Sequence, residues 1–404
     1  MFKGIIDTTL RDGQQSPLLF DSYKYSFSLS DKQKLLFGLL NLGVKYIEFF
    51  SPVVSNHEKK EFIEIKKNIK AIDKRTKLLA HCRCNLNDIN EAITVGFDGL
   101  NLYLNGTKDA RLHSYNKNLS TLKADIKKII TEIRSKYPGL YLRFSIEDAF
   151  RTKKQDLYSI FDEIYGFVNT LGIPDTVGIA SPDIVKVLVS DLTHRYPHVD
   201  LECHFHNDRG LALINTIIAI ESGVSYADTS IWGLAERSGI ASTTGVLFNL
   251  FQTDKNLVKD YNLALCYPLN VLMGSILHMQ VPYNEPVSIT NRTHIAGVHH
   301  KAVLNSTTIY EAHHLERFGV TKNQLLLGPL TGWNLIYYYL KEFEFFDISQ
   351  EQAKRIALEF KNQAKKLNER FRPEILLINI ANQYQLKKIN IKNQYLERRL
   401  ENLS

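Results

Sequence analysis

Cysteine is scarce in this chain, which contains only four among its 404 residues. So few cysteines exclude the disulfide framework of a small secreted protein and favour a reducing compartment. The apolar runs, such as residues 211–220, stop well short of the roughly 18 residues that a membrane-spanning helix needs. The first residues lead into a charged segment and not into the apolar stretch of a signal peptide. We therefore expect a cytoplasmic protein without a membrane segment.

Glycine-rich phosphate-binding loops are absent as well. The sequence has neither a Walker motif nor the pattern G-x-G-x-x-G, so nucleoside triphosphates and dinucleotides are not expected ligands. The formal net charge is +7, and the basic residues form no stripe interleaved with aromatic residues. A nucleic-acid partner is therefore not expected either, and the positive charge suits a small anionic ligand better.

Short apolar runs that alternate with longer amphipathic stretches are what the sequence does contain. The stretch 31–42 predicts a helix with Asp31 as its N-cap and Gly43 as its stop. About 250 residues of strand–helix alternation predict a (β/α)8 TIM barrel, an α/β fold, with a doubly wound sheet as the alternative. The predicted strands are residues 4–7, 44–49, 77–80, 99–104, 140–145, 171–175, 201–204 and 226–230.

The alternation ends after about residue 277. We therefore predict a catalytic barrel over residues 1–277, followed by a smaller and mostly helical C-terminal domain. Within that domain we expect a linker and lid-like subdomain at 278–345 and a helical subdomain at 346–404. The first of these contains a histidine-rich stretch, in which we expect His300, His313 and His314 to be solvated.

Polar residues gather at the C-terminal ends of predicted strands, where barrel enzymes place their chemistry. The first strand leads into Arg11 and Asp12, which offer a guanidinium and a carboxylate, although a loop held by ion pairs is the alternative. His204 and His206 end another strand, and residues two apart on a strand point to the same side. Imidazole and carboxylate ligands suit a catalytic divalent metal, whereas two ordinary histidines are the alternative. Cys82 and Cys84 have no second cysteine pair, so we expect packed free thiols.

The motifs at residues 7–15 and 204–208 together resemble the DRE-TIM metallolyases, the family of isopropylmalate synthases, homocitrate synthases and related lyases. The likeness extends over about residues 3 to 340 and is greatest to the homocitrate synthases. Asn101 stands where lysine-regulated members often carry an acidic residue, so lysine inhibition does not follow. The further matching motifs lie at residues 46–55, 81–84, 143–151, 175–178, 228–239, 296–299 with Tyr310, and 330–334.

This resemblance implies an acyltransferase that condenses acetyl-CoA with 2-oxoglutarate in a metal-dependent Claisen reaction. The products would be homocitrate and CoA, within lysine biosynthesis. A sibling synthase of the isopropylmalate or citramalate type, acting on another 2-oxo acid, is the alternative. An acyl-CoA lyase is less favoured, because the family's lyases use a Gly-Cys loop that does not surround Cys266. A regulatory barrel without catalysis is less favoured because the metal-ligand set is intact.

The resemblance also implies roles for single residues. Asp12, His204 and His206 would hold the metal, which could be zinc, manganese, magnesium or cobalt. His299 and Tyr310 would act on the barrel of a neighbouring subunit, in a domain-swapped homodimer. The catalytic residues would be Glu147 as the base, His299, Tyr310, and His81 as a proton donor. The substrate-binding residues would be Arg11, Gln15, Glu48, Arg111 for the distal carboxylate, Arg143, Ser145, Thr176 and Glu202.

Overall fold

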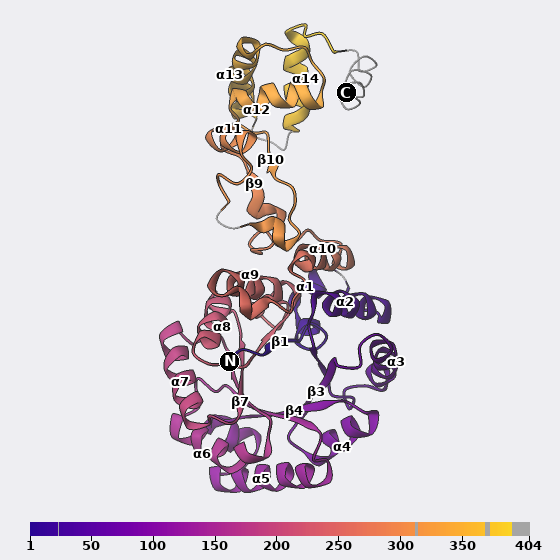
Figure 1. Cartoon of the computed structure of the whole chain (residues 1–404), viewed down its shortest axis with the longest axis vertical. Coiled ribbons are helices and arrows are strands. Elements are labelled where there is room, and N and C mark those ends of the chain that lie inside the picture. Colours follow the sequence, from indigo (N-terminus) through magenta and orange to yellow (C-terminus); the bar gives the residue numbers. More distant parts are fainter. Residues whose placement is uncertain (23, 312–313, 368–371, 390–404) are drawn as a thin grey trace. The chain divides into compact units, whose positions relative to one another are not determined.

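The computed structural model describes residues 1–404 except 23, 312–313, 368–371 and 390–404 (Figure 1). The chain forms two compact units, Met1–Val287 and Ser288–Ser404. Each unit is described by itself below.

The first unit is a closed barrel of eight parallel strands in sequence order, with helices around the outside (Figure 1). This confirms the predicted (β/α)8 fold and excludes a doubly wound sheet. The strands are β1 (Gly4–Asp7), β2 (Tyr46–Phe50), β3 (Lys77–Arg83), β4 (Gly99–Asn105), β5 (Tyr141–Glu147), β6 (Thr170–Asp175), β7 (Asp200–Phe205) and β8 (Tyr226–Thr229). The helices are α1 (Pro17–Asp21), α2 (Leu29–Leu42), α3 (Asn56–Ile72), α4 (Leu86–Val95), α5 (Leu119–Lys136), α6 (Lys154–Ile164), α7 (Pro182–Arg195), α8 (Ala212–Glu221), α9 (Thr243–Thr253) and α10 (Cys266–Leu277).

Helix α2 begins two residues before its predicted start. Ser28 is its N-cap, and the side chain of Asp31 accepts a hydrogen bond from the backbone N–H of Ser28, which completes a capping box. Asp31 is therefore the third residue of the helix and not its cap. The helix ends at Gly43 as predicted, because the chain there has a φ of 109°, which glycine adopts without strain.

Alternation along each strand divides apolar from polar side chains. On β5, Leu142, Phe144 and Ile146 are fully buried on the helix-facing side. Arg143 and Ser145 lie between them in sequence and point into the barrel, where Ser145 lines a cavity at the C-terminal end. The N-terminal end of the barrel is closed by an apolar and aromatic layer made of Ile6, Leu79, Tyr226, Tyr46 and Tyr141. The strand pattern thus directs polar groups toward the C-terminal mouth.

The barrel unit extends ten residues beyond the predicted boundary at 277, to Val287. The segment after α10 is tied to the barrel by two hydrogen bonds. Thr244 Oγ1 donates to the buried Glu285 carboxylate over 2.8 Å, and Asn270 Nδ2 donates to the carbonyl of Val287 over 3.0 Å. Residues 278–287 therefore belong with the barrel and not with the C-terminal region.

The second unit is mostly helical, as predicted, with a small parallel pair of strands. One apolar core joins residues on both sides of the predicted boundary at 345, including Ile336, Phe346, Ile356 and Leu377. The two predicted subdomains therefore share a core. The elements are β9 (Thr293–His294), α11 (Gly297–Asn305), β10 (Gln324–Leu325), α12 (Trp333–Tyr338), α13 (Gln350–Lys366) and α14 (Pro373–Gln383).

The histidine-rich stretch in this unit is only partly solvated. His300 is fully buried, because its Nε2 bonds to the carbonyl of His294 over 3.0 Å inside the fold, so the expectation of a solvated side chain is wrong there. The side chain of His314 is 65% exposed, as expected. His313 lies outside the described residues.

Candidate active site and metal centre

A cavity of about 490 Å³ opens at the C-terminal mouth of the barrel. This is the end at which barrel enzymes carry their active sites, because the loops after the strands converge there. Most of the residues singled out in the sequence meet here. Those that line the cavity are Arg11, Asp12, Gln15, His81, Ser145, Glu147, Thr176, Glu202, His204 and His206.

Asp12, His204 and His206 form a buried group whose ligand atoms all lie within 4.8 Å of one another. His204 Nε2 is 3.2 Å from Asp12 Oδ2, and His206 Nε2 is 3.8 Å from the same oxygen. The two Nε2 atoms are 3.3 Å apart. The loop after β1 supplies the carboxylate, while the end of β7 supplies both imidazoles from one side of the strand.

The donor atoms fit a divalent cation. Among the described residues, Asp12 Oδ2 is a buried oxygen that accepts no hydrogen bond. Two imidazole nitrogens that face each other at 3.3 Å cannot both carry a proton there without repulsion, so at least one of them offers a lone pair beside the Asp12 carboxylate. One carboxylate with two imidazoles is a ligand set that zinc, manganese or iron accepts with open positions for substrate.

Burial and mutual contacts shift the pKa values of the three groups in different directions. Burial alone would lower the pKa of His204, but contacts with the Asp12 and Asp228 carboxylates outweigh it and raise that pKa to about 9. Burial and the neighbouring charge of His204 lower the pKa of His206 to about 3. Burial disfavours the Asp12 carboxylate, yet the Arg11 guanidinium and the two histidines hold the pKa of Asp12 well below its usual value. Asp12 is therefore an anion at neutral pH, as a metal ligand must be.

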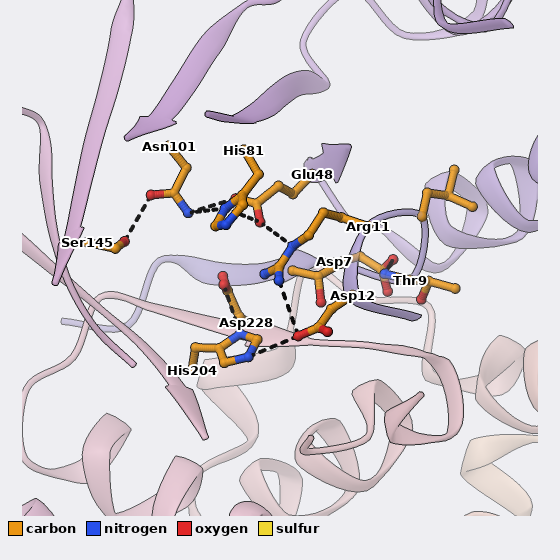
Figure 2. A network of polar contacts seen from close by, with 12 residues as sticks. Asp7, Thr9, Arg11, Asp12, Glu48, His81, Asn101, Ser145, His204 and Asp228 are labelled. Carbon is orange, nitrogen blue, oxygen red and sulfur yellow. Dashed lines mark hydrogen bonds and ion pairs between the residues drawn. The ribbon is translucent and has the colours of Figure 1, made fainter. Parts of the chain in front are cut away.

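Asp228 orients one of the two imidazoles from behind. Its Oδ2 lies 3.2 Å from Nδ1 of His204, so the other ring nitrogen of His204 is turned toward Asp12 (Figure 2). A carboxylate behind a metal-binding histidine is the usual way in which proteins fix the ring. No role was predicted for Asp228, although the sequence contains a signal: a carboxylate two residues after Tyr226, on a strand whose alternate residues face the barrel interior.

Glu48 connects three residues below the cavity. Arg11 Nε donates to Glu48 Oε1 over 3.0 Å, and Asn101 Nδ2 donates to Glu48 Oε2 over 3.0 Å (Figure 2). His81 Nδ1 lies 3.3 Å from Glu48 Oε1. Burial opposes ionisation, but the charges of Arg11, His81 and Arg143 hold the pKa of Glu48 well below its usual value. Glu48 is therefore a fixed anion that supports the cavity wall and does not line the cavity itself.

His81 presents its ring between Glu48 and an aromatic face. The ring stacks on Tyr103 with centroids 4.1 Å apart and planes 12° apart. Burial, followed by the positive charge of Arg11, lowers the pKa of His81 below 6.5. The protonated form of this imidazole is therefore a stronger acid than an ordinary histidine.

Arg143 lies in the barrel interior and is fully buried. Its guanidinium contacts three carboxylates: Glu48 at 3.1 Å, Glu202 at 2.9 Å and Asp228 at 3.2 Å. One cation cannot balance three buried anions. Burial and the charge of Asp228 accordingly raise the pKa of Glu202 to about 8, so that Glu202 keeps its proton at neutral pH.

Gly172 on β6 lies next to Ser145 and Glu202. A Cβ atom at this position would lie 2.1 Å from Ser145 Oγ and 2.4 Å from Glu202 Oε2. Ser145 also donates to Asn101 Oδ1 over 2.9 Å (Figure 2). The glycine thus provides the space in which Ser145 and Glu202 sit side by side.

Glu147 and Thr176 stand on the far rim of the cavity. Glu147 ends β5 and is half-buried, and burial raises its pKa above 4.5. The hydroxyl of Thr176 accepts a hydrogen bond from the backbone N–H of Asp148 over 2.8 Å. A carboxylate with a raised pKa beside a cavity is suited to accept a proton at neutral pH.

Arg111 does not reach the cavity. It lies at residues 110–114 in the loop region after β4, and it is buried against Asp156, with Nη2 2.6 Å from Oδ2. Arg111 is not among the residues that line the cavity, and its partner Asp156 belongs to α6. Two of its guanidinium nitrogens, Nε and Nη1, are buried without a hydrogen-bond partner among the described residues. The role of this arginine toward a substrate carboxylate stays a prediction.

His299 and Tyr310 belong to the second unit, where they lie together. Their ring centroids are 4.1 Å apart, and His294 lies 6.1 Å from His299 and 6.2 Å from Tyr310. Tyr310 is 46% exposed. His299 and Tyr310 are eleven residues apart in the sequence, and in the structure their rings are in contact.

Two other expectations concern cysteines and membranes. Cys82 and Cys84 are free thiols, the first buried and the second half-buried, as predicted. Among the described residues, no helix combines the length and the apolar character needed to cross a membrane.

Comparison with known proteins identifies the family. A model of the HMGL-like family matches residues 3–266, and a model described as homocitrate synthase post-HMGL domain-like matches residues 287–368. A mitochondrial homocitrate synthase of Schizosaccharomyces pombe is 33% identical over 360 residues, which cover 88% of this chain and 83% of that protein. A 2-isopropylmalate synthase of Ruminiclostridium cellulolyticum is 28% identical over 89% of this chain and 70% of that protein.

A solved structure, that of an HMG-CoA lyase from Bacillus subtilis, has the same barrel fold. Its TM-score is 0.57 at 21% identity, over 70% of this chain and 96% of that chain. The buried group of Asp12, His204 and His206 is typical of the metal site of HMGL-like proteins. The chain therefore belongs to the HMGL-like family, as a Claisen-type condensing enzyme and homocitrate synthase-like acyltransferase.

Proposed function

We propose that this protein condenses acetyl-CoA with 2-oxoglutarate and releases homocitrate and CoA. The observation that carries the proposal is the buried group of one carboxylate and two imidazoles at the barrel mouth, in a chain whose C-terminal region matches a homocitrate synthase domain. Lysine biosynthesis is the pathway that such a product would enter. The cytoplasm stays a prediction, since the relative from Schizosaccharomyces pombe is described as mitochondrial.

Asp12, His204 and His206 would hold the divalent metal. A metal bound there would polarise the ketone of the 2-oxo acid and stabilise negative charge on its oxygen. Arg11 and Gln15 lie on the same rim of the cavity and would orient the carboxylate next to the ketone. Thr176, on the opposite side, would donate its hydroxyl to that carboxylate, because its oxygen already accepts from the backbone of Asp148.

Glu147 would remove a methyl proton from acetyl-CoA. The reaction needs a base close to the thioester, and burial gives Glu147 a pKa above that of an ordinary glutamate. His81 would return a proton to the new alkoxide from the other side of the cavity. The stacking on Tyr103 would fix the ring of His81. Its lowered pKa makes the protonated ring a stronger acid than an ordinary histidine.

The distal carboxylate of 2-oxoglutarate would lie against Ser145 and His81, above the buried guanidinium of Arg143. Ser145 and His81 line the cavity, and Arg143 lies below them in contact with Glu48 and Glu202. Glu202 would stay protonated and so would not repel the carboxylate. The charge of Arg143 is already taken up by Glu48 and Asp228, so Arg111 stays the predicted source of positive charge for this carboxylate.

A sibling synthase that acts on another 2-oxo acid is the second candidate. It is favoured by two observations: the relative that is a 2-isopropylmalate synthase, and the placement of Arg111 against Asp156, outside the cavity lining. A substrate with an apolar tail would need no cation at that end.

His299 and Tyr310 would complete the site in a second copy of the chain. Both lie in the second unit, and Tyr310 is half-exposed, so its face is available to a partner. The proposed assembly is a homodimer in which each C-terminal unit serves the barrel of the other subunit.

The proposal is tested by measuring CoA release from acetyl-CoA with a thiol reagent, in the presence of one divalent metal and one 2-oxo acid at a time. We expect the highest kcat/KM with 2-oxoglutarate and a loss of turnover in His204→Ala. Preference for 2-oxoisovalerate or pyruvate would instead establish the sibling synthase. Unchanged turnover in His204→Ala would contradict the metal site itself.

A further inference from the structure

An ion pair is buried inside the second unit, away from its apolar core. The side chain of Arg292 is 2% exposed and that of its partner Glu311 is 4% exposed, with Nη2 2.8 Å from Oε2. Arg292 Nη1 also donates to the carbonyl of Val320 over 2.5 Å. Removing two charges from water costs more than their attraction returns unless the geometry is good, so a buried pair of this kind is weak evidence for a gain in stability.

Both oxygens of the Glu311 carboxylate are engaged. Oε2 accepts from Arg292, and Oε1 accepts from the backbone N–H of Leu315 over 2.6 Å. Glu311 is therefore fixed from two directions, and the residue directly before it is Tyr310. The backbone that carries the tyrosine ring is held by its neighbour's side chain, while the ring itself is 46% exposed.

Arg292 stands at the other end of the same arrangement. It directly precedes β9 (Thr293–His294), and α11 with His299 begins three residues after β9. The guanidinium thus joins the segment that carries Tyr310 to the segment that leads into His294 and His299. The result is the aromatic contact in which the rings of His299 and Tyr310 have centroids 4.1 Å apart.

We propose that Arg292 and Glu311 are positioning residues that hold the ring of Tyr310 against that of His299. This inference rests on the proposed function insofar as these two rings act on acetyl-CoA. The Arg292–Glu311 pair touches no substrate and would act only through the tyrosine. Loss of the Arg292 charge would leave Glu311 buried without its cation, and loss of the Glu311 charge would leave Arg292 with the Val320 carbonyl and the more distant Glu316 carboxylate at 3.8 Å. In both cases the segment around Tyr310 would move.

The test compares the native full-length chain with two single variants, Arg292→Met and Glu311→Gln. We expect kcat for CoA release to fall by about 100-fold, as misplacement of a catalytic group by about 1 Å can cause, with KM for the 2-oxo acid unchanged. Arg292→Lys, which keeps the charge, should recover part of kcat. Lys32→Met is the control, because it removes a similarly buried cation in the barrel unit, where the lysine is 2% exposed and pairs with Glu58 and Glu61. That control should lower Tm without lowering kcat.

A second readout does not depend on activity. The chain is labelled selectively on histidine, and the ring-proton NMR signals of His299 are assigned by their loss in His299→Gln. Because the two ring centroids are 4.1 Å apart, we expect the ring current of Tyr310 to shift these signals in the folded chain. We expect Arg292→Met to move these signals toward those of Tyr310→Leu. Unchanged signals together with unchanged kcat would overturn the positioning role. If the native chain fails to condense any 2-oxo acid, the proposed function is wrong, whereas the NMR shift still decides whether Arg292 positions Tyr310.

Discussion

Asp228 and His204 meet behind the metal-binding group, with Asp228 Oδ2 3.2 Å from His204 Nδ1. The carboxylate fixes the ring so that His204 Nε2 faces Asp12 at 3.2 Å. We expect Asp228→Asn to weaken divalent metal binding by about 10- to 100-fold, as loss of such a supporting carboxylate usually does. Competition with a chelating dye measures this affinity. Asp200→Asn at the start of β7 is the control and should bind metal like the native chain, and equal affinity in both variants would argue against the orienting role.

The pH dependence of turnover should reflect the ionisation of the Glu147 carboxyl group. Burial raises its pKa above 4.5, so the base is protonated and inactive at pH values where an ordinary glutamate is already ionised. As the pH falls, kcat should therefore decline on an acid limb above pH 4.5. Glu147→Gln should abolish turnover. A native rate that stays constant from neutral pH down to pH 4.5 would contradict Glu147 as the base.

Gly172 tests how tightly the pocket below the cavity is packed. A Cβ in Gly172→Ala would lie 2.1 Å from Ser145 Oγ, so either the serine or the strand must move. We expect the free energy of unfolding to drop by about 1–3 kcal/mol and KM for the 2-oxo acid to rise. Urea unfolding and steady-state kinetics measure the two effects. Gly139→Ala is the matched control, since nothing lies within 4 Å of its Cβ position and both quantities should stay constant.

The proposed homodimer, in which His299 serves the barrel of the other subunit, can be tested by complementation. Glu147→Gln and His299→Gln should each be inactive alone. After unfolding and refolding of an equal mixture, half of the dimers are mixed and each has one intact site, so about a quarter of native activity should return. Activity is measured by CoA release. If His299 served its own barrel, the mixture would stay inactive.

Asp7 should make the stability of the barrel depend on pH. Burial raises its pKa from 3.8 to about 7, so the folded chain keeps a proton that the unfolded chain loses. This contribution is complete below pH 3.8 and is lost as the pH rises toward 7. Asp7→Asn keeps an acceptor for the backbone N–H of Thr9 and removes the ionisation. In urea unfolding it should therefore gain stability relative to the native chain at pH 8 but not at pH 4, and an equal difference at both pH values would contradict the assignment.

Much of the barrel was predictable from the sequence because its signals are local. Alternating apolar residues gave strands close to their observed bounds, and the two-residue spacing of His204 and His206 is sufficient to put both imidazoles on one side of β7. Asp12 lies in the loop region after β1, so its place at the barrel mouth also follows from the order of elements. The histidine–tyrosine pair of the second unit depended on the family resemblance.

Only the tertiary structure decided which distant groups meet. Asp228 reaches His204 from the neighbouring strand, and a bare backbone at Gly172 makes room for Ser145, two contacts that depend on strand register around a closed barrel. Arg111 contacts Asp156, which lies 45 residues further along the chain, and this pairing also depends on the fold. The sequence by itself determined the strands and the ligand types, since these depend on neighbours along the chain. Closure of the barrel decided the partners, protonation states and space of the site, since these depend on residues far apart in sequence.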